Sequence, residues 1–403
     1  MKRRILMLTS QYLPEVFGGA EQQCKRLSEE LAGRGHDVTI LTSCTDPANT
    51  GDAEEGGIRV VRLFAKHPPQ MMGRRIASSL KWSGAVKTWM RQNQSAFDLV
   101  HCHQGKFNAW IGTQMAMKLG KPSLVKIGNA GDRMDLLRLS KKRFVYGIRL
   151  AQSIIAKAGK FVVISTDMAH DLERFGIKKS RITYIPNGIR APDQVQTITP
   201  ALRNQTRLDL GLPSEAQVFL FTGRLDRQKN VATLIDGFGR TAGNHSNALL
   251  LIVGAGDEEA ALKTQAANQI PDGQVRFLGR QENIWPLYQA ADCFVLPALA
   301  EGLSNSLLEA QVCGLPVIAT KVSGTNDFVD DGKSGLLFEP RDGSALSDHL
   351  TTVLAMSEAN RTAMGKRGQE YVRQHANFEI VAANYEALYS ELLTSASNSI
   401  ENV

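Results

Sequence analysis

The sequence has no long apolar run, so we do not expect a membrane-spanning helix. No stretch of its 403 residues approaches the roughly 20 apolar residues that a bilayer requires. The N-terminal apolar segment Ile5–Leu8 is too short for a secretory signal and is more typical of a first buried strand. We therefore expect a cytoplasmic protein.

Cysteine is scarce as well, which argues against a disulfide framework or a zinc site. The five cysteines are odd in number and dispersed, without the spacing of metal ligands: Cys24, Cys44, Cys102, Cys293 and Cys313. The fingerprint G-x-G-x-x-G is also absent, which disfavours a nicotinamide or flavin site. Reduced thiols without a bound cofactor are the expectation.

The charge of the chain is unevenly distributed. Residues 1–190 hold 31 Lys and Arg against 15 Asp and Glu, whereas residues 191–403 hold 16 against 25. A basic half indicates an anionic partner. No helix-turn-helix, zinc or aromatic-basic motif accompanies the charge, so nucleic acid is disfavoured and an anionic membrane surface fits better.

Two segments of the basic half could provide such a membrane contact. Residues 70–92 and 139–160 combine Lys and Arg with Trp, Met, Phe or Tyr at helical spacing. Basic helices of this kind can lie in a lipid interface. They can equally be helices whose apolar side faces the core while the lysines are solvated.

Apolar runs of strand length alternate with helical patterns along the whole chain, which predicts an α/β protein with two doubly wound parallel sheets. A chain of this length is also too long for one core. We predict an N-terminal domain over residues 1–190, a linker over 191–205 that contains two prolines, a C-terminal domain over 206–375, and a helix with a tail over 376–403.

The segment Glu301-Gly-Leu-Ser-Asn-Ser-Leu-Leu-Glu309 follows a strand-like run that ends at Pro297. Ser304 or Asn305 can cap a helix there, which directs backbone N–H groups toward an anion. Glu301 would lie before the helix and Glu309 two turns into it. One carboxylate could contact a sugar and the other a ribose, or both could simply be solvated.

Three further turns follow strand-like runs in the second half. Gly223-Arg224 and Lys229 stand before a helix, where a glycine and two cations could clamp a diphosphate or form a solvated basic turn. Gly254 and Gly279-Arg280 follow the next two runs. The carboxyl ends of strands are where open α/β sheets bind ligands.

Taken in order, these segments resemble the family-4 glycosyltransferases. The motifs that carry the resemblance are Gly18-Gly19-Ala20-Glu21, Ile185-Pro-Asn187-Gly188, Gly223-Arg224 with Lys229, Gly254-x-Gly256, and Glu301 with Glu309. The similarity extends from about Ile5 to Leu393. It implies a GT-B architecture: two Rossmann-like domains that face a cleft, with a C-terminal helix that crosses back to the first domain.

The resemblance also implies roles for individual residues. Arg224 and Lys229 match the cations that neutralise the donor diphosphate, Glu301 matches the residue at the transferred sugar, and Glu309 matches the ribose-binding carboxylate. The remaining donor-binding matches are Gly18, Gly19, Gly223, Gly254, Arg280, Leu303 and Ser304. No Asp-x-Asp stands at a strand end, so the expected reaction needs no metal and no cofactor beyond the nucleotide-sugar co-substrate.

The sequence departs from this family at a position close to the sugar. Many relatives have a histidine after the strand that corresponds to Ser123–Ile127, whereas this chain has Gly128-Asn129 and then Asp132. Asn129 and Asp132 are candidate sugar or acceptor contacts. His101 and His103, at the end of the preceding strand, are two more candidates in the same predicted cleft.

From this resemblance we expect a retaining hexosyltransferase of polysaccharide biosynthesis. It would move a hexose from a UDP- or GDP-sugar to a lipid-linked or membrane-presented glycan, as a cytoplasmic protein that contacts the inner face of the plasma membrane. Two alternatives stay open. One is a nucleotide-sugar-binding protein with little turnover, and the other is an epimerase or synthase that acts on a soluble sugar phosphate.

Overall fold

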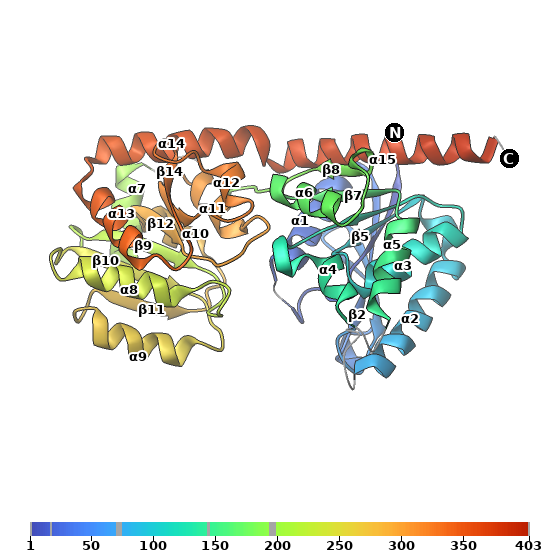
Figure 1. The fold of residues 1–403 in the computed structure, drawn as a ribbon, viewed down its shortest axis with the longest axis horizontal. Coiled ribbons are helices and arrows are strands. Elements are labelled where there is room, and N and C mark those ends of the chain that lie inside the picture. The colour runs from blue at the N-terminus through green and yellow to red at the C-terminus, as the bar shows by residue number, and fades with distance from the viewer. Residues whose placement is uncertain (1, 17, 70–74, 143–145, 193–198, 402–403) are drawn as a thin grey trace. The chain divides into compact units, whose positions relative to one another are not determined.

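The computed structural model describes residues 2–16, 18–69, 75–142, 146–192 and 199–401. The chain divides into two compact units (Figure 1). Unit 1 comprises Met1–Gly188 and Phe378–Val403, and unit 2 comprises Ile189–Asn377. Both units are α/β, so the predicted fold class is confirmed.

Unit 1 contains an eight-stranded sheet in the order β3-β4-β2-β1-β5-β6-β7-β8. Its strands are β1 (Arg4–Leu8), β2 (Asp37–Cys44), β3 (Gly51–Glu55), β4 (Ile58–Phe64), β5 (Leu99–His103), β6 (Ser123–Lys126), β7 (Lys160–Val163) and β8 (Ile182–Tyr184). All neighbours pair in parallel except β3, which pairs antiparallel with β4. Sequence analysis missed β3 because every residue of this edge strand is exposed and none forms an apolar alternation.

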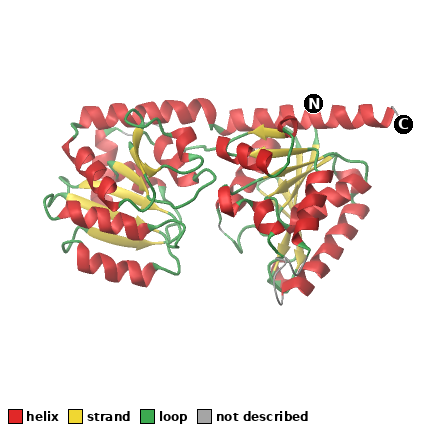
Figure 2. Ribbon diagram, viewed as in Figure 1, coloured by secondary structure: helices red, strands yellow, loops and turns green. Residues whose placement is uncertain are grey.

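Helices cover both faces of this sheet (Figure 2). They are α1 (Gly19–Gly33), α2 (Arg75–Gln92), α3 (Phe107–Lys118), α4 (Asp135–Ser140), α5 (Gly147–Lys157), α6 (Thr166–Arg174) and α15 (Phe378–Glu401). Side chains of α1 and α15 pack in one core with residues of β1 and β2. On the opposite face Gly112 of α3 lies so close to Cys102 of β5 that a Cβ would approach its Sγ to 2.5 Å.

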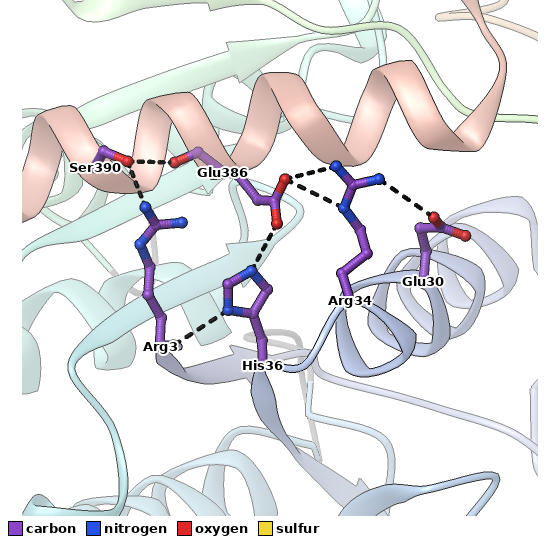
Figure 3. Close-up of polar contacts among 6 residues, drawn as sticks. All are labelled: Arg3, Glu30, Arg34, His36, Glu386 and Ser390. Carbon is purple, nitrogen blue, oxygen red and sulfur yellow. Dashed lines mark hydrogen bonds and ion pairs between the residues drawn. The ribbon is translucent and has the colours of Figure 1, made fainter. Parts of the chain in front are cut away.

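Helix α15 is part of unit 1, as expected for the C-terminal helix, although it comes last in the chain. Tyr385 and Tyr389 are fully buried within the first core. Glu386 forms the polar attachment shown in Figure 3: Oε2 accepts from Arg34 Nη2 at 2.8 Å, and Oε1 lies 2.8 Å from His36 Nε2. Because the Arg3 N–H donates to Nδ1 of the same imidazole, Nε2 carries the proton and donates to Glu386.

Unit 2 contains a six-stranded parallel sheet in the order β11-β10-β9-β12-β13-β14. Its strands are β9 (Gln217–Thr222), β10 (Ala248–Val253), β11 (Val275–Gly279), β12 (Cys293–Leu296), β13 (Val317–Thr320) and β14 (Gly335–Phe338). Its helices are α7 (Pro200–Asp209), α8 (Val231–Ala242), α9 (Glu259–Gln269), α10 (Trp285–Ala290), α11 (Asn305–Val312), α12 (Thr325–Phe328), α13 (Gly343–Ala355) and α14 (Glu358–His375). Apolar residues of α8, α9 and α13 pack with β9 and β10 in a second core.

The structure revises the predicted linker. Helix α7 begins at Pro200, where Thr199 Oγ1 accepts from the Leu202 N–H at 3.2 Å, so residues 200–205 are helical rather than linking. Residues 193–198 of the predicted linker lie outside the described residues. Proline at the first helical position is favourable because its missing N–H needs no partner there, and the prolines alone were therefore a poor linker signal.

Each basic segment buries some apolar side chains and exposes others: Leu80 of α2 is 53% exposed, and Ile154 of the other segment is fully buried. In α2, Trp82, Val86 and Met90 recur at helical spacing and are all fully buried, so this segment faces the core. In the other segment Tyr146 and Ile148 are 67% and 49% exposed. Residues 70–74 and 143–145 of the two segments lie outside the described residues. In the described part of the chain, no helix is long and apolar enough to cross a bilayer.

Candidate functional site

Two loops at the carboxyl edge of the unit 2 sheet are tied together. The loop between β9 and α8 contacts the loop between β12 and α11 through three hydrogen bonds. The Leu299 N–H donates to the Gln228 carbonyl at 2.8 Å, Gln228 Nε2 donates to the Ala300 carbonyl at 2.7 Å, and Asn230 Nδ2 donates to the Pro297 carbonyl at 3.0 Å. Sequence reasoning missed Gln228 and Asn230, because side chains that bond across loops leave no local pattern.

Lys229 and Glu301 form an ion pair across these loops. Lys229 Nζ lies 2.7 Å from Glu301 Oε1, and the two side chains are only 13% and 11% exposed. A pair this sheltered experiences a stronger field than a surface pair, because less water screens it. The structure therefore brings together the predicted diphosphate cation and the predicted sugar-side carboxylate.

Arg224 lies in the same loop but in a different environment. Its Nη1 lies 3.0 Å from Asp226 Oδ2, and its side chain is 67% exposed. The other oxygen of Asp226 accepts from the backbone N–H groups of Gln228 and Lys229 at 3.0 and 3.1 Å. Asp226, which the sequence did not single out, thus shapes the turn that carries both cations.

Glycines at this edge allow backbone segments to approach closely. A Cβ on Gly254 would lie 1.8 Å from the Gly223 carbonyl oxygen, and Gly254 has a φ of +137°. A Cβ on Gly324, in the loop after β13, would lie 1.9 Å from the Gly302 carbonyl oxygen. Gly324 was not predicted, and it places a further loop directly against the Glu301 loop.

Helix α11 begins at Asn305, with Ser304 at the N-cap position. The Ser304 side chain makes no capping bond and lies 2.9 Å from the Ser306 hydroxyl instead. Glu309 is buried in this helix, and its Oε2 accepts from the Tyr288 hydroxyl at 3.1 Å.

Two other predicted donor contacts lie in loops of unit 2. Leu303 is buried in the loop before α11. Arg280 is exposed immediately after β11.

In unit 1, Gly18 and Gly19 enter helix α1. Gly18 is the N-cap residue and Gly19 begins the helix. A Cβ on Gly18 would lie 2.1 Å from Glu21 Oε2, so the glycine makes room for this buried carboxylate. The glycine pair is therefore placed at the carboxyl end of β1, as the sequence predicted for a βαβ opening.

A single carboxylate organises the loops after β5 and β6. Buried Asp135 accepts from the N–H groups of Gly105 and Gly128 at 3.2 and 3.0 Å, and from Asn129 Nδ2 at 3.0 Å. Asn129 is thus held in place at this edge. Asp132 is 97% exposed and lies 3.7 Å from Lys141 Nζ. Sequence reasoning chose Asp132 and missed Asp135, since the two carboxylates differ only in what surrounds them.

The two histidines do not reach the predicted cleft. His101 and His103 are 0% and 2% exposed, and their rings stack with centroids 4.3 Å apart. His101 Nδ1 lies 2.9 Å from the Tyr389 hydroxyl of α15. Strand β5 continues through His103, so both side chains point into the core beneath α15. The sequence placed both rings at an accessible edge of the sheet and did not reveal their burial, because the covering helix α15 is far away along the chain.

Burial also keeps these two rings uncharged. Desolvation lowers the pKa of His103 to about 3, with the charge of Lys126 adding to the effect. It lowers the pKa of His101 well below its ordinary value, again with His103 and Lys126 as lesser causes. Burial likewise lowers the pKa of Lys126 to about 8. Neutral rings without solvent access are poorly suited to contact a sugar or transfer its protons.

Comparison with known proteins gives this arrangement a family context. Residues 17–215 match the family model described as Glycosyltransferase Family 4, and residues 203–371 match that described as Glycosyl transferases group 1.

Among the described residues, no group of three or more His, Cys, Asp or Glu side chains is arranged to hold a metal ion.

Three proteins illustrate the similarity. The D-inositol 3-phosphate glycosyltransferase of Corynebacterium urealyticum is 28% identical over 94% of this chain and 91% of its own length. The glycogen synthase of Mycobacterium tuberculosis is 28% identical over 87% of this chain and 86% of its own. The crystal structure of Anabaena HepE with UDP and glucose superposes with a TM-score of 0.78 at 19% identity, covering 97% of this chain and all of that one.

Proposed function

The chain belongs to the glycosyl transferases of group 1, and from this premise we propose that it transfers a hexose from a UDP- or GDP-sugar with retention of anomeric configuration. The group uses nucleotide sugars, and a structural neighbour of the same fold was solved with UDP and glucose. Those findings support a nucleotide-sugar donor. That the sugar is a hexose, that the base is uracil or guanine, and that the anomeric configuration is retained are our proposals.

The observation that carries this proposal is the sheltered pair between Lys229 and Glu301. Cleavage of a sugar–phosphate bond develops negative charge on the diphosphate and positive charge at the anomeric carbon. A fixed cation suits the first charge and a fixed carboxylate suits the second. Groups that are already oriented before the reaction stabilise a transition state without reorganisation, which is often the largest catalytic contribution.

We propose that the cationic side chains take the part that a divalent ion plays in other transferases. Arg224 and Lys229 stand in the turn that leads into α8 and supply positive charge for the leaving diphosphate. Retention would follow from attack on the face of the departing phosphate, whose oxygen accepts the proton of the acceptor. Transfer that persists in excess EDTA would support this, and transfer restored only by added Mg²⁺ would contradict it.

The first experiment identifies the donor. Purified protein is screened by thermal shift against UDP, GDP and ADP, and the corresponding radiolabelled sugar nucleotides are then incubated with a membrane fraction. We expect stabilisation by UDP or GDP and label in the lipid extract. If no common UDP- or GDP-sugar yields a transferred sugar with a competent membrane fraction, the proposed reaction is wrong.

We further propose that the acceptor is presented at an anionic membrane surface. Residues 75–160 contain 16 Lys and Arg but only three acidic residues. At the start of α5, Tyr146 and Ile148 are exposed and the Arg149 guanidinium lies 5.3 Å from the Tyr146 ring centroid. Aromatic and apolar side chains beside cations are suited to the interface between headgroups and acyl chains.

Flotation with vesicles that contain an anionic lipid tests this contact. Binding should weaken with salt and should decrease several-fold in the Tyr146→Ser, Ile148→Ser double variant. The Leu208→Ser variant is the matched control, because Leu208 is an equally exposed apolar residue in the acidic half of the chain. Salt-insensitive binding, or equal losses in both variants, would contradict the proposal.

A soluble acceptor is the second candidate, because the name of the Corynebacterium relative gives D-inositol 3-phosphate as its acceptor. Transfer to a soluble sugar or polyol phosphate, unaffected by added lipid, would favour it over a membrane-presented glycan. A binding protein with little turnover is the third, since Gly128-Asn129 stands where many relatives have a histidine. Calorimetry that shows nucleotide binding without donor hydrolysis or transfer would favour that alternative.

A further inference from the structure

Three buried side chains, one of them on α11, are connected by hydrogen bonds. The Thr222 hydroxyl, at the end of β9, lies 2.6 Å from the Tyr288 hydroxyl of α10. The Tyr288 hydroxyl lies 3.1 Å from Glu309 Oε2. All three residues are almost completely buried, and the Tyr288 ring also contacts the rings of Trp285 and Phe294. The phenol is therefore fixed in position from several sides.

The direction of the protons follows from the chemistry of the three groups. An ionised carboxylate only accepts, so the Tyr288 O–H donates to Glu309. The Tyr288 oxygen then accepts the proton of the Thr222 hydroxyl. The Ser306 carbonyl is a competing acceptor at 3.4 Å, but it is more distant and uncharged. Burial, and then the charge of Glu309, raise the pKa of Tyr288 well above its ordinary value, which keeps the phenol protonated.

We propose that Tyr288 is a positioning residue that orients the Glu309 carboxylate toward the ribose of the donor nucleotide. The inference rests on the proposed function and on the ribose contact that the family resemblance implies for Glu309. Charged hydrogen bonds are the stronger class and fix orientation most effectively in a dry environment. A carboxylate has about four acceptor positions, so a bond to the phenol is compatible with a bond to a sugar hydroxyl.

Removal of the Tyr288 hydroxyl should change how the protein recognises the ribose of the nucleotide. Without the phenol hydroxyl, Glu309 loses one of the hydrogen bonds that fix its orientation. Recognition of the ribose hydroxyl should weaken, while the diphosphate contacts of the other loop remain. Tyr288 touches no reacting atom, so we expect a higher KM for the donor and a kcat that is nearly unchanged.

The test compares the Kd values of several nucleotides for the wild-type protein and for its variants. The Kd of the nucleoside diphosphate chosen by the thermal-shift screen is compared by calorimetry with the Kd values of its 2′-deoxy and 3′-deoxy forms. For the wild-type protein we expect one deoxy form to bind about 10- to 100-fold more weakly, the range for a charged hydrogen bond. In Tyr288→Phe this ratio should fall to about 3-fold or less. Glu309→Gln should abolish most of the discrimination.

Two further variants separate positioning from general stability. Thr222→Val breaks the same chain from its other end, leaves the phenol able to donate, and should reduce the ratio less than Tyr288→Phe does. Tyr385→Phe is the matched control: Tyr385 is also a fully buried tyrosine, and its hydroxyl has no hydrogen-bond partner among the described residues. This control should leave the ratio and all three Kd values unchanged.

The outcomes distinguish the inference from the function on which it rests. If Tyr288→Phe folds and keeps the wild-type ratio while Glu309→Gln loses it, the positioning role is wrong and the ribose role stands. If neither deoxy form binds more weakly to the wild-type protein, the ribose role itself is wrong and the inference fails with it. If Tyr288→Phe does not fold, Thr222→Val decides, and an unchanged ratio there contradicts the inference.

Discussion

The carboxyl edges of the two sheets use their charged side chains differently. In unit 2, Lys229 and Glu301 pair with each other, and Arg224 remains largely exposed. In unit 1, Asp135 is buried and accepts from two backbone N–H groups and from Asn129. At the unit 2 edge two oppositely charged side chains pair across loops, whereas at the unit 1 edge a single carboxylate binds loop backbones, although both edges are built from the same strand–loop–helix units.

This comparison indicates which kind of charged residue to expect at the carboxyl edge of each sheet. A diphosphate is strongly charged, so the edge that we propose to bind it needs cations whose positions are set by neighbouring side chains. In unit 1, by contrast, Asp135 holds two loops through their backbones. Variants of the two edges should therefore affect different measurements.

The largest expected effect is that of Lys229→Ala on catalysis. The loss of a sheltered cation should lower kcat by about 10²- to 10³-fold, because charge on the leaving diphosphate is no longer stabilised. Arg224→Ala should lower kcat by only about 10-fold, since water screens an exposed cation. Steady-state kinetics at saturating donor measure both.

Lys333→Ala provides the control for that comparison. Lys333 forms an exposed ion pair with Asp330 at 3.0 Å in the same unit, so its removal should leave kcat unchanged. Equal losses in Lys229→Ala and Lys333→Ala would mean that net charge, rather than the sheltered pair, matters at this edge.

The next effect concerns Asp135→Ala in unit 1. Three donors lose their acceptor, the Gly105 N–H buried and the other two partly buried, so the free energy of unfolding should fall by about 2–3 kcal/mol. The KM of the acceptor should rise, whereas the Kd of the nucleoside diphosphate should not change. Chemical denaturation and calorimetry measure these quantities. Asp132→Ala, an exposed neighbour, is the control and should change unfolding by less than about 0.5 kcal/mol.

A smaller, pH-dependent effect is expected from Glu386 of α15. Hydrogen bonds from Arg34, which outweigh desolvation, hold the pKa of Glu386 below its ordinary value of 4.5. A depressed carboxyl pKa stabilises the fold above the unfolded value, and this contribution is lost as the pH falls through the folded value. Glu386→Gln should therefore lower the free energy of unfolding by about 1 kcal/mol near neutral pH.

The same substitution should have no effect once the pH lies well below the folded pKa of Glu386, because the wild-type carboxyl is then protonated as well. Urea denaturation at several pH values between neutrality and about pH 3 gives the required profile. A difference between Glu386→Gln and the wild-type protein that does not vary with pH would show that the side chain acts through packing, not charge.

The smallest effect is expected from Ser304→Ala in unit 2. Because the Ser304 hydroxyl makes no capping bond, its loss should cost no more than about 0.5 kcal/mol. Asp342→Ala is the comparison, since Asp342 Oδ1 accepts from the Ala345 N–H at 2.9 Å and a lost cap costs about 1 kcal/mol. Thermal unfolding measures both. Equal losses would show that Ser304 does support its helix.

Sequence reasoning located most strands because their side chains form a local pattern. The strands of unit 2, from β9 to β14, lie among the apolar runs from which the alternation was predicted. The exposed strand β3 lacks that pattern and was missed. The turn that carries Arg224 and Lys229 was placed correctly at a strand end for the same reason: glycine, cations and a helix start are neighbours in sequence.

The α/β alternation, the two sheets and the order of the charged turns follow from the sequence, because each depends on residues a few positions apart. The folded structure was needed to show that His101 and His103 are buried beneath α15, that Asp135 rather than Asp132 holds the loops, and that Tyr288 contacts Glu309. Burial and hydrogen-bond partners depend on segments that are distant along the chain. The tyrosine that binds His101, for example, lies 288 residues away.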